Sequence, residues 1–287
     1  MAFDVYQMVT DKIVAVLGEK RIPWHKPWQA IDNQNYESKH RYSGINFLLL
    51  QCSEFKSPFW ITFKGVQKYK DAKIKKGEYS TQVVFWRMVK GEKTDKRGVK
   101  TPTTFPLLRY YNVFNWEQTE GLKDKMPEFV LKAHSPIAEI DATIQVWLSE
   151  KRCAPIEWGS NKACYIPDKD VIYMPEKGLF DNEHQYYATI FHEIVHSTKG
   201  DNRSGRTKDK GYAFEELVAE IGASFLCHRF GIPEKTIENT KAYCQSWAEK
   251  LKNDPKMVVY AAGKAEKAVS YLLGEKENKE EVVAEVA

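Results

Sequence analysis

The sequence lacks the features that mark secreted, disulfide-stabilised and membrane-spanning proteins. Its five cysteines are scattered along the chain without C-x-x-C spacing, so neither a disulfide framework nor a zinc ribbon is expected. No uninterrupted run of about 18 apolar residues occurs, which excludes a transmembrane helix. The first residues have neither a basic start nor a continuous apolar core, so we expect no signal peptide and a cytoplasmic protein.

The net charge is only +4, but it is distributed unevenly along the chain. Residues 1–125 hold 22 Lys and Arg against 13 Asp and Glu, whereas the remainder holds 21 against 26. A basic first half favours a polyanionic partner, although a solvated basic face without a partner is the simpler alternative. No helix-turn-helix or zinc-finger pattern occurs, so recognition of bases in the duplex major groove is not expected.

The first half combines a helical pattern with three strand patterns. Apolar residues recur at helical spacing over 3–18, and the proline-containing segment 21–29 is expected to be irregular. Aromatic and β-branched runs then predict three strands, namely PFWITF (58–63), QVVFWRMVK (82–90) and FPLLRYYNVFNWEQ (105–118). The charged segment between the last two strands, 91–104, is rich in turn residues and is expected to be a hairpin loop.

Aromatic side chains alternate with basic side chains throughout this first half. Aromatic faces stack on unpaired bases while Lys and Arg follow the phosphates, so the pattern predicts binding of single-stranded DNA without sequence recognition. The competing interpretation places many of these aromatic side chains in the domain core, with the tryptophans of segment 21–29 the least core-like. The residues expected to contact the strand are Trp24, Lys26, Trp28, Tyr42, Trp60, Lys64, Trp86, Arg87, Arg109 and Tyr111.

A charged segment containing Gly and Pro, 119–133, is expected to connect two domains, which we place at 1–126 and 134–287. The second domain begins with a helical pattern over 135–149 and a predicted hairpin over 163–175, and several more helical patterns follow. The predicted fold class is therefore α+β with two domains. A small antiparallel sheet with helices is followed by a mostly helical domain with a short β-sheet.

The most specific motif is H-E-x-x-H at 192–196, within YATIFHEIVHSTKG. On a helix His192 and His196 lie one turn apart and aim at one point, which is half of a tetrahedral metal site. Glu193 follows the first histidine, where it can take a proton from a water molecule at the metal. The alternative is a chance match on an ordinary buried helix.

A second helical pattern, 212–233, offers the third metal ligand. Glu216 and Glu220 are four residues apart and point the same way, while Gly222 allows close packing against a neighbour. Burying two glutamates on such a helix is costly unless a charged partner is present, and a metal ion is such a partner. One of the two is expected to bind the metal and the other to orient a histidine, with a slight preference for Glu216 as ligand. Glu215 is expected on a different face, outside the site.

Three protein ligands with the fourth position open are typical of catalytic zinc, so Zn²⁺ is the expected cofactor, with Mn²⁺ or another divalent ion as the alternative. Two functions remain open. The chain is either a zinc-type metallopeptidase or a binding protein whose metal site is structural or vestigial. A metal-dependent nuclease fits less well, because such sites gather several carboxylates around two ions.

At this point the motifs resemble a known family. NKACYIP, DVIYMP, YYATIFHEIVHSTKG and YAFEELVAEIGASFLCHRFGIP resemble the zincin-like metallopeptidase domain of polyvalent and antirestriction proteins. IPWHKPW, YSGINFLLL, PFWITF, VVFW and YYNVFN resemble the single-stranded-DNA-binding domain that precedes it in ArdC-like antirestriction proteins. The resemblance implies a protein of a plasmid or other mobile element that protects incoming DNA from host restriction during conjugation. Its protein substrate is unknown, and a host restriction component is one candidate.

Overall fold

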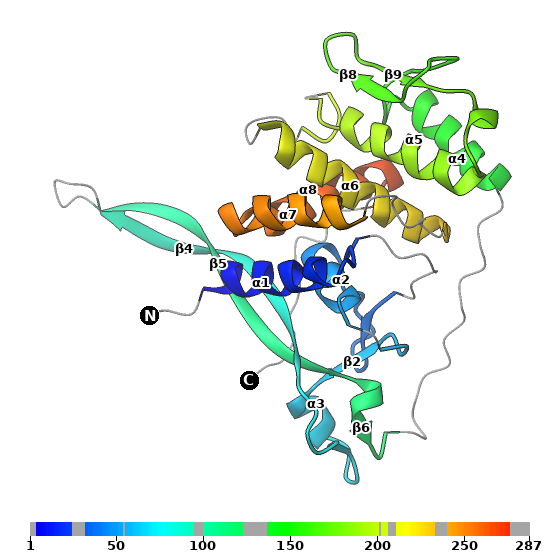
Figure 1. Ribbon diagram of the computed structural model, residues 1–287. Helices are drawn as coiled ribbons and strands as arrows, with labels where there is room; N and C mark the ends of the chain where they lie inside the picture. Colours follow the sequence, from blue (N-terminus) through cyan, green and yellow to red (C-terminus); the bar gives the residue numbers. More distant parts are fainter. Residues whose placement is uncertain are drawn as a thin grey trace.

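The structure is a computed structural model that describes residues 4–24, 32–53, 55–94, 100–122, 137–200, 202–205, 211–232 and 240–275. The predicted domain boundaries, 126 and 134, therefore lie outside the described residues. The fold class is α+β with two domains, as predicted. The first part of the chain forms a small sheet with helices, and the second part is mostly helical with a short sheet (Figure 1).

The first part begins with helix α1, in which Asp4 caps the N-terminus by accepting hydrogen bonds from the backbone N–H groups of Tyr6 and Gln7. A four-stranded sheet follows in the order β1-β2-β5-β4, and β3 pairs with β6 separately. The elements are α1 (Val5–Gly18), β1 (Gln34–Asn35), α2 (Gly44–Gln51), β2 (Phe59–Thr62), α3 (Phe63–Gln67), β3 (Lys73–Ile74), β4 (Thr81–Thr94), β5 (Lys100–Asn115) and β6 (Thr119–Glu120).

Strands β4 and β5 form a two-stranded ribbon that is much longer than the sheet. Their antiparallel register runs from Thr81 opposite Val113 to Thr94 opposite Lys100. Figure 1 shows the ribbon extending as a twisted arm away from the helices. The segment 91–104, predicted as a loop, is therefore largely strand. Its mostly polar sequence has no alternation of apolar and polar residues, which is the pattern that reveals a half-buried strand.

Within its described residues, the second part places a three-stranded sheet and four α-helices around α5, the helix that carries the H-E-x-x-H segment. The elements are α4 (Ile137–Ser149), β7 (Ile156–Trp158), β8 (Cys164–Ile166), β9 (Val171–Met174), α5 (Glu183–Ser197), α6 (Gly211–Phe230), α7 (Thr240–Asn253) and α8 (Met257–Leu273). Strand order is β7-β9-β8, so β8 is an edge strand, and it lies beside α5. The helices described here are too short or too polar to pass through a lipid bilayer.

Helices α5 and α6 approach closely at Gly222. A Cβ atom at this position would lie 2.8 Å from Cγ1 of Val195, so any larger residue would push the helices apart. The close packing predicted from Gly222 is confirmed at this contact. Both helices carry residues of the predicted metal site, so their separation controls where those side chains meet.

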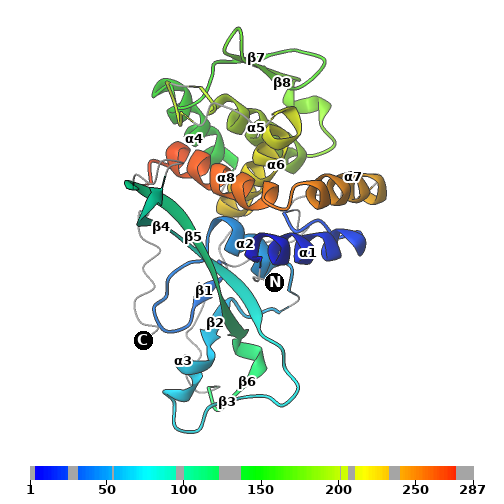
Figure 2. The same cartoon turned by 90° about the vertical axis from the view of Figure 1, so that its left-hand side faces the viewer.

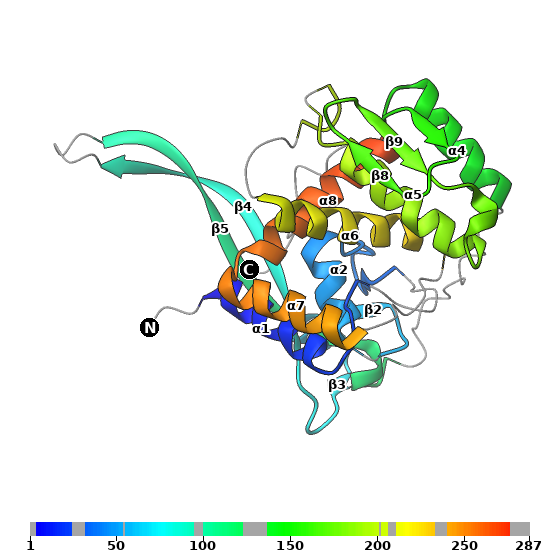
Figure 3. The same cartoon turned by 45° about the horizontal axis from the view of Figure 1, so that its top comes forward.

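The largest hydrophobic core runs through both parts of the chain. Ile13 of α1 and Leu48 of α2 are buried in the same cluster as Phe191 of α5 and Ala261 of α8. Figures 2 and 3 show α1 alongside α7 and α2 against α8. An apolar interface therefore joins the two parts, in addition to the connecting chain.

Candidate metal centre

Helix α5 presents its histidines because its other face is buried. Asn182 caps the helix by accepting a hydrogen bond from the backbone N–H of Gln185 at 3.0 Å. Phe191 and Ile194 are fully buried in the core, which leaves His192 and His196 on the face toward a cleft. The apolar residues of the motif thus fix the rotation of the helix, and this rotation aims both imidazoles outward.

The two histidines meet Glu216 of α6. Nε2 of His192 lies 3.1 Å from Nε2 of His196, and the carboxylate oxygens of Glu216 lie 3.7 and 3.5 Å from these two atoms. A tetrahedral centre with bonds of about 2.05 Å has ligand–ligand edges of about 3.3 Å. The three side chains therefore fit a divalent metal ion. Two histidines and one carboxylate on one side of an ion are also compatible with an octahedral centre.

Glu220 lies one turn beyond Glu216 and has a different contact. The hydroxyl of Tyr243 on α7 donates a hydrogen bond to it, and that hydroxyl in turn accepts one from Nε1 of Trp24 at 3.4 Å. Among the described residues, the three-ligand cluster contains Glu216 and does not contain Glu220. This arrangement favours Glu216 as the metal ligand.

Glu215 lies inside the site, and the prediction that placed it outside is wrong. Its Oε1 lies 3.3 Å from Nδ1 of His196, on the opposite side of the imidazole from the ligand cluster. If Nε2 of His196 binds a metal, Nδ1 carries the proton and donates a hydrogen bond to Glu215. This hydrogen bond fixes the imidazole ring and raises the basicity of Nε2. Neighbouring residues on a helix point about 100° apart. Glu215 and Glu216 can therefore reach opposite sides of one ring.

The acidic surroundings change the protonation of the ligands. Burial alone would lower the pKa of His192, but the hydrogen bond to Glu216 and the charge of Glu220 outweigh burial and raise it. The same hydrogen bond lowers the pKa of Glu216. Because only a neutral imidazole binds a metal, the raised pKa of His192 makes protons compete more strongly with the ion.

Glu193 is buried and connects α5 to the edge strand β8. Its Oε2 accepts a hydrogen bond of 2.7 Å from the backbone N–H of Tyr165. The side chain of Tyr165 is fixed as well, because its hydroxyl donates to Asp170, which also receives two hydrogen bonds of 2.7 Å from Arg203. Arg203 further donates to the carbonyl of Ser197 at the end of α5. These contacts hold β8 at a fixed place beside the motif.

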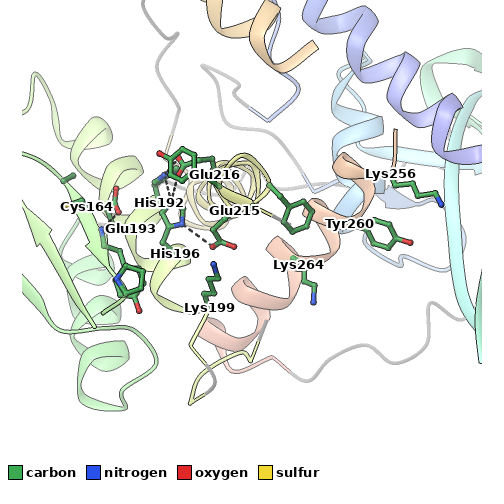
Figure 4. A pocket seen from close by; sticks show the side chains of 16 residues that line it. Cys164, His192, Glu193, His196, Lys199, Glu215, Glu216, Lys256, Tyr260 and Lys264 are labelled. Atoms are coloured by element: carbon green, nitrogen blue, oxygen red, sulfur yellow. Dashed lines mark hydrogen bonds and ion pairs between the residues drawn. The ribbon is translucent and has the colours of Figure 1, made fainter. Parts of the chain in front are cut away.

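A cleft of about 1210 Å³ opens beside these residues. This volume exceeds that of a typical small-molecule pocket and is suited to a segment of a larger substrate. Tyr212, in the first turn of α6, lines the cleft and donates a hydrogen bond to Glu216. Figure 4 shows the two histidines, Glu215 and Glu216 together with Lys199 at one end of the cleft, and Lys256 and Lys264 on the other side.

Two of the residues expected to stack on DNA bases are buried, so this prediction is wrong for them. Trp24 is 1% exposed and packs edge-on against Trp247, and Trp60 is also 1% exposed with its indole N–H bonded to Asn33. Pro23 beside Trp24 favoured an irregular, accessible position, but Trp24 packs into the helical core.

Of the other eight predicted DNA contacts, four have side chains that the structure describes and four do not. Tyr42 and Tyr111 are half-buried, while Lys64 and Arg109 are exposed. Lys26 and Trp28, and the side chains of Trp86 and Arg87, lie outside the described residues. Three aromatic residues of this part outside the expected contacts are exposed, namely Phe63, Tyr79 and Tyr110, with exposed fractions of 54%, 87% and 38%. Phe63 and Tyr110 belong to the alternating aromatic and basic pattern, whereas Tyr79 does not.

Two protein families match successive parts of the chain. Residues 3–114 match the N-terminal domain of anti-restriction factor ArdC, and residues 144–264 match the zincin-like metallopeptidase family. The metal-free crystal structure of antirestriction protein ArdC from plasmid R388 is 32% identical, with a TM-score of 0.73, over 94% of this chain and 97% of that chain. The Mn(II)-bound structure is 31% identical with the same TM-score, over 97% of this chain and 100% of that chain.

Two curated proteins are similar over most of this chain. The uncharacterized protein y4eC of Sinorhizobium fredii is 29% identical over 94% of this chain and 91% of its own length. DNA primase TraC of Escherichia coli is 30% identical over 93% of this chain, but the matched region is only 27% of that protein. The chain therefore corresponds to one part of a much longer primase.

Proposed function

The chain belongs to the ArdC-like antirestriction family, and on that premise we propose that it protects incoming plasmid DNA from host restriction during conjugation. In this proposal the first part binds single-stranded DNA, and the second part is a metal-dependent peptidase that acts on a protein. A host restriction component is the candidate substrate. The similarity to part of a DNA primase and to a plasmid antirestriction protein supports a nucleic-acid partner and a plasmid context.

The observation that carries the peptidase proposal is the convergence of His192, His196 and Glu216, whose ligand atoms lie 3.1, 3.5 and 3.7 Å apart. We propose that these residues hold Zn²⁺, for which histidine and carboxylate ligands are common, with Mn²⁺ as the alternative. A bound divalent ion would supply Lewis-acid polarisation of a peptide carbonyl and of the attacking water. The crystal structure of ArdC from plasmid R388 in its Mn(II)-bound form supports the binding of a divalent ion in this family.

The protein's own residues would perform the remaining steps. The carboxylate of Glu193 takes a proton from the attacking water and gives it to the nitrogen of the leaving amine. Glu215 keeps the proton of His196 on Nδ1, so that Nε2 stays available to the metal. The edge strand β8 is positioned to bind an extended peptide by strand addition, which aligns the peptide with the site.

Substitution of the general base tests this mechanism. Glu193→Gln is expected to retain bound metal and to lose peptide cleavage by at least about a hundredfold, because the amide cannot accept the proton. We would incubate a restriction-proficient cell extract with each metal-loaded protein and measure new peptide N-termini by mass spectrometry. Glu139→Gln, an exposed carboxylate change on α4, serves as the control. Full cleavage by Glu193→Gln would contradict the mechanism.

The second candidate function is protection by coating the DNA, with a metal site that has no catalytic role. The same Glu193→Gln variant separates the two functions in a plasmid-transfer assay with a restricting recipient. The peptidase proposal predicts loss of protection, whereas protection by coating alone predicts that transfer is unchanged. Bound metal is measured in parallel, so that loss of the ion is not mistaken for loss of catalysis.

The single-strand proposal rests on accessible aromatic and basic side chains of the first part. Half-buried Tyr42 and Tyr111 can stack on bases, while exposed Arg109 and Lys64 can contact phosphates. Binding to single strands is expected to exceed binding to duplex and to weaken steeply with salt. An Arg109→Ala and Tyr111→Ala double variant should bind single strands about tenfold or more weakly, whereas Lys252→Ala on α7 should not. Equal binding to duplex, or indifference to salt, would refute the proposal.

A further inference from the structure

One wall of the metal cleft is basic, although the metal end of the same cleft is acidic. Lys256, Tyr260 and Lys264 follow at intervals of four residues along α8 and all line the cleft. Side chains four residues apart lie on one face of a helix, so this face of α8 is a continuous wall. Lys199, just after α5, lines the cleft at the same end as His196 (Figure 4).

The lysines of this wall have no carboxylate partner among the described residues. No ion pair joins Lys199, Lys256 or Lys264 to any carboxylate of that part of the chain, although Glu215 and Glu216 line the same cleft. Those two glutamates contact the histidines instead. Within the described part of the chain, the positive charge on the α8 side of the cleft is therefore available to a ligand.

The wall ends where α8 meets α1. The ammonium group of Lys256 lies 5.4 Å from the ring centre of Tyr6, and this ring stacks on Tyr260 with a centroid distance of 5.9 Å. The two tyrosine hydroxyls are 3.4 Å apart. These contacts fix Lys256 and Tyr260 at the far end of the wall, on the side away from the histidines (Figure 4).

We propose that the cleft selects an acidic polypeptide segment, with carboxylate side chains of the substrate paired to Lys264 and Lys256 while the scissile bond lies at the metal. This inference rests on the proposed peptidase function. Lys256 and Lys264 are separated by about 12 Å along the helix axis, at about 1.5 Å per residue. An extended peptide covers this distance in about four residues. The substrate therefore carries two acidic residues about four positions apart.

The charge pattern favours a polypeptide over a nucleic acid. A nucleic-acid strand carries a negative charge at every nucleotide, so it would place phosphates beside Glu193, Glu215 and Glu216 as well as beside the lysines. A polypeptide segment carries charge only where its sequence has an acidic or basic residue. In addition, the backbone of the edge strand β8 faces the cleft, where the N–H of Tyr165 already bonds to Glu193. Such an edge pairs with a polypeptide backbone.

Peptide hydroxamates provide a test that measures binding instead of turnover. We would use fluorescent ten-residue peptides that carry a metal-chelating hydroxamate. In one series the hydroxamate is at the C-terminus of the peptide, and in the other it is at the N-terminus. Each series compares two glutamates four residues apart with two glutamines at the same positions. Affinity is measured by fluorescence anisotropy for the Zn²⁺-loaded full chain, with and without a Lys256→Gln and Lys264→Gln double change. A Lys76→Gln and Lys252→Gln double variant, altered at two exposed lysines outside the cleft, is the control.

In at least one series, the glutamate peptide is expected to bind wild type about three- to tenfold more tightly than the glutamine peptide, as for exposed ion pairs. The preference should vanish in the Lys256/Lys264 variant, persist in the control and decline with salt. Equal binding of the two peptides, with binding still metal-dependent, overturns this inference and leaves the peptidase proposal intact. Absence of metal-dependent hydroxamate binding overturns both. Displacement of the hydroxamate by single-stranded DNA, lost in the Lys256/Lys264 variant, assigns the wall to nucleic acid and overturns the inference.

Discussion

At the scale of single residues, the candidate metal centre depends on side chains that hold its ligands as much as on the ligands themselves. Glu215 fixes His196, and Tyr243 holds Glu220 beside His192. On the other side of the cleft, Asp170 and Arg203 hold Tyr165 and with it the edge strand. Changes at these supporting residues should alter the site without removing a ligand.

The Asp170–Arg203 pair predicts a pH-dependent stability. The hydrogen bonds from Arg203 lower the pKa of Asp170 below its ordinary value. The contribution of the pair is therefore fully present above about pH 4 and is lost as the pH falls through the lowered pKa. Asp170→Asn is expected to reduce the free energy of unfolding at pH 7 by about 1 kcal/mol, since the Asp170 side chain is 43% exposed and solvent screens it.

Urea unfolding at pH 7, 5 and 3 measures this difference. The difference in unfolding free energy between wild type and Asp170→Asn should be smaller at pH 3, because below the ordinary pKa of aspartate the unfolded wild-type chain takes up a proton at Asp170 and is stabilised by it. Asp168→Asn, at an exposed position in the same turn, is the control and should behave like wild type. If the difference in unfolding free energy between wild type and Asp170→Asn stayed constant from pH 7 to pH 3, the charge of the Asp170–Arg203 pair would not contribute to stability.

Sequence patterns predicted some of these residues and not others, for physical reasons. The convergence of His192 and His196 is predicted by helical spacing alone, because that spacing depends only on local geometry. The position of Glu215 depends on how α5 and α6 face each other, and the sequence does not contain this rotation. Burial of Trp24 and Trp60 likewise depends on packing between distant segments. Aromatic side chains can stack on bases or fill a core, and their type does not separate the two.

At the scale of elements, the contact between α5 and α6 sets the distance between the histidines and Glu216. Gly222 allows this contact because an added Cβ atom would meet both methyl groups of Val195, at 2.8 and 3.0 Å. Gly222→Ala is expected to lower the free energy of unfolding by about 1–3 kcal/mol through overpacking, despite the higher helix propensity of alanine. It should also weaken metal binding, since the ligands move apart.

A second change at the same contact tests this explanation. Val195→Ala removes the methyl groups that the new Cβ atom would meet, so the double variant should regain part of the stability and of the metal affinity lost in Gly222→Ala. Gly263→Ala on α8 is the control, because a Cβ atom there has no neighbour within 4 Å. Additive losses in the double variant would mean that the two residues are not coupled.

The elements themselves were predicted with uneven success. The helices around 187–200 and 212–233 have strong periodic patterns, and the structure contains both. The two-residue strand β1, which pairs in parallel with β2, was not foreseen because so short a segment has no pattern. The sequence predicts a loop for the outer half of the β4–β5 ribbon, because a polar strand without alternating apolar residues has no recognisable period.

At the scale of the whole molecule, the shared hydrophobic core predicts that both parts of the chain unfold together. Trp24 lies at this interface, where it contacts Trp247 and donates to Tyr243. Trp24→Ala is expected to lower the free energy of unfolding by about 3–5 kcal/mol, as for other large buried side chains. The folded variant should bind single-stranded DNA normally, because a buried indole cannot stack on a base.

Calorimetry and DNA binding check this prediction together. Wild type should show one thermal transition, and Trp24→Ala should lower its midpoint, while Tyr79→Ala, at an 87% exposed position, should leave it unchanged. If Trp24→Ala does not fold, Trp24→Phe is used instead. Two separate transitions in wild type would contradict the shared core. If Trp24→Ala lost DNA binding without losing stability, Trp24 would be part of the DNA-binding surface after all.

The candidate active site depends on the binding of one divalent metal ion by His192, His196 and Glu216. The affinity of the protein for the metal tests this binding directly. Competition with a chromophoric chelator gives the stoichiometry and the affinity of Zn²⁺ for wild type, Glu216→Gln and Glu220→Gln. We predict one ion per chain for wild type, a loss of more than about a hundredfold in affinity for Glu216→Gln, and at most about a tenfold loss for Glu220→Gln. Wild-type affinity in Glu216→Gln would contradict the claim.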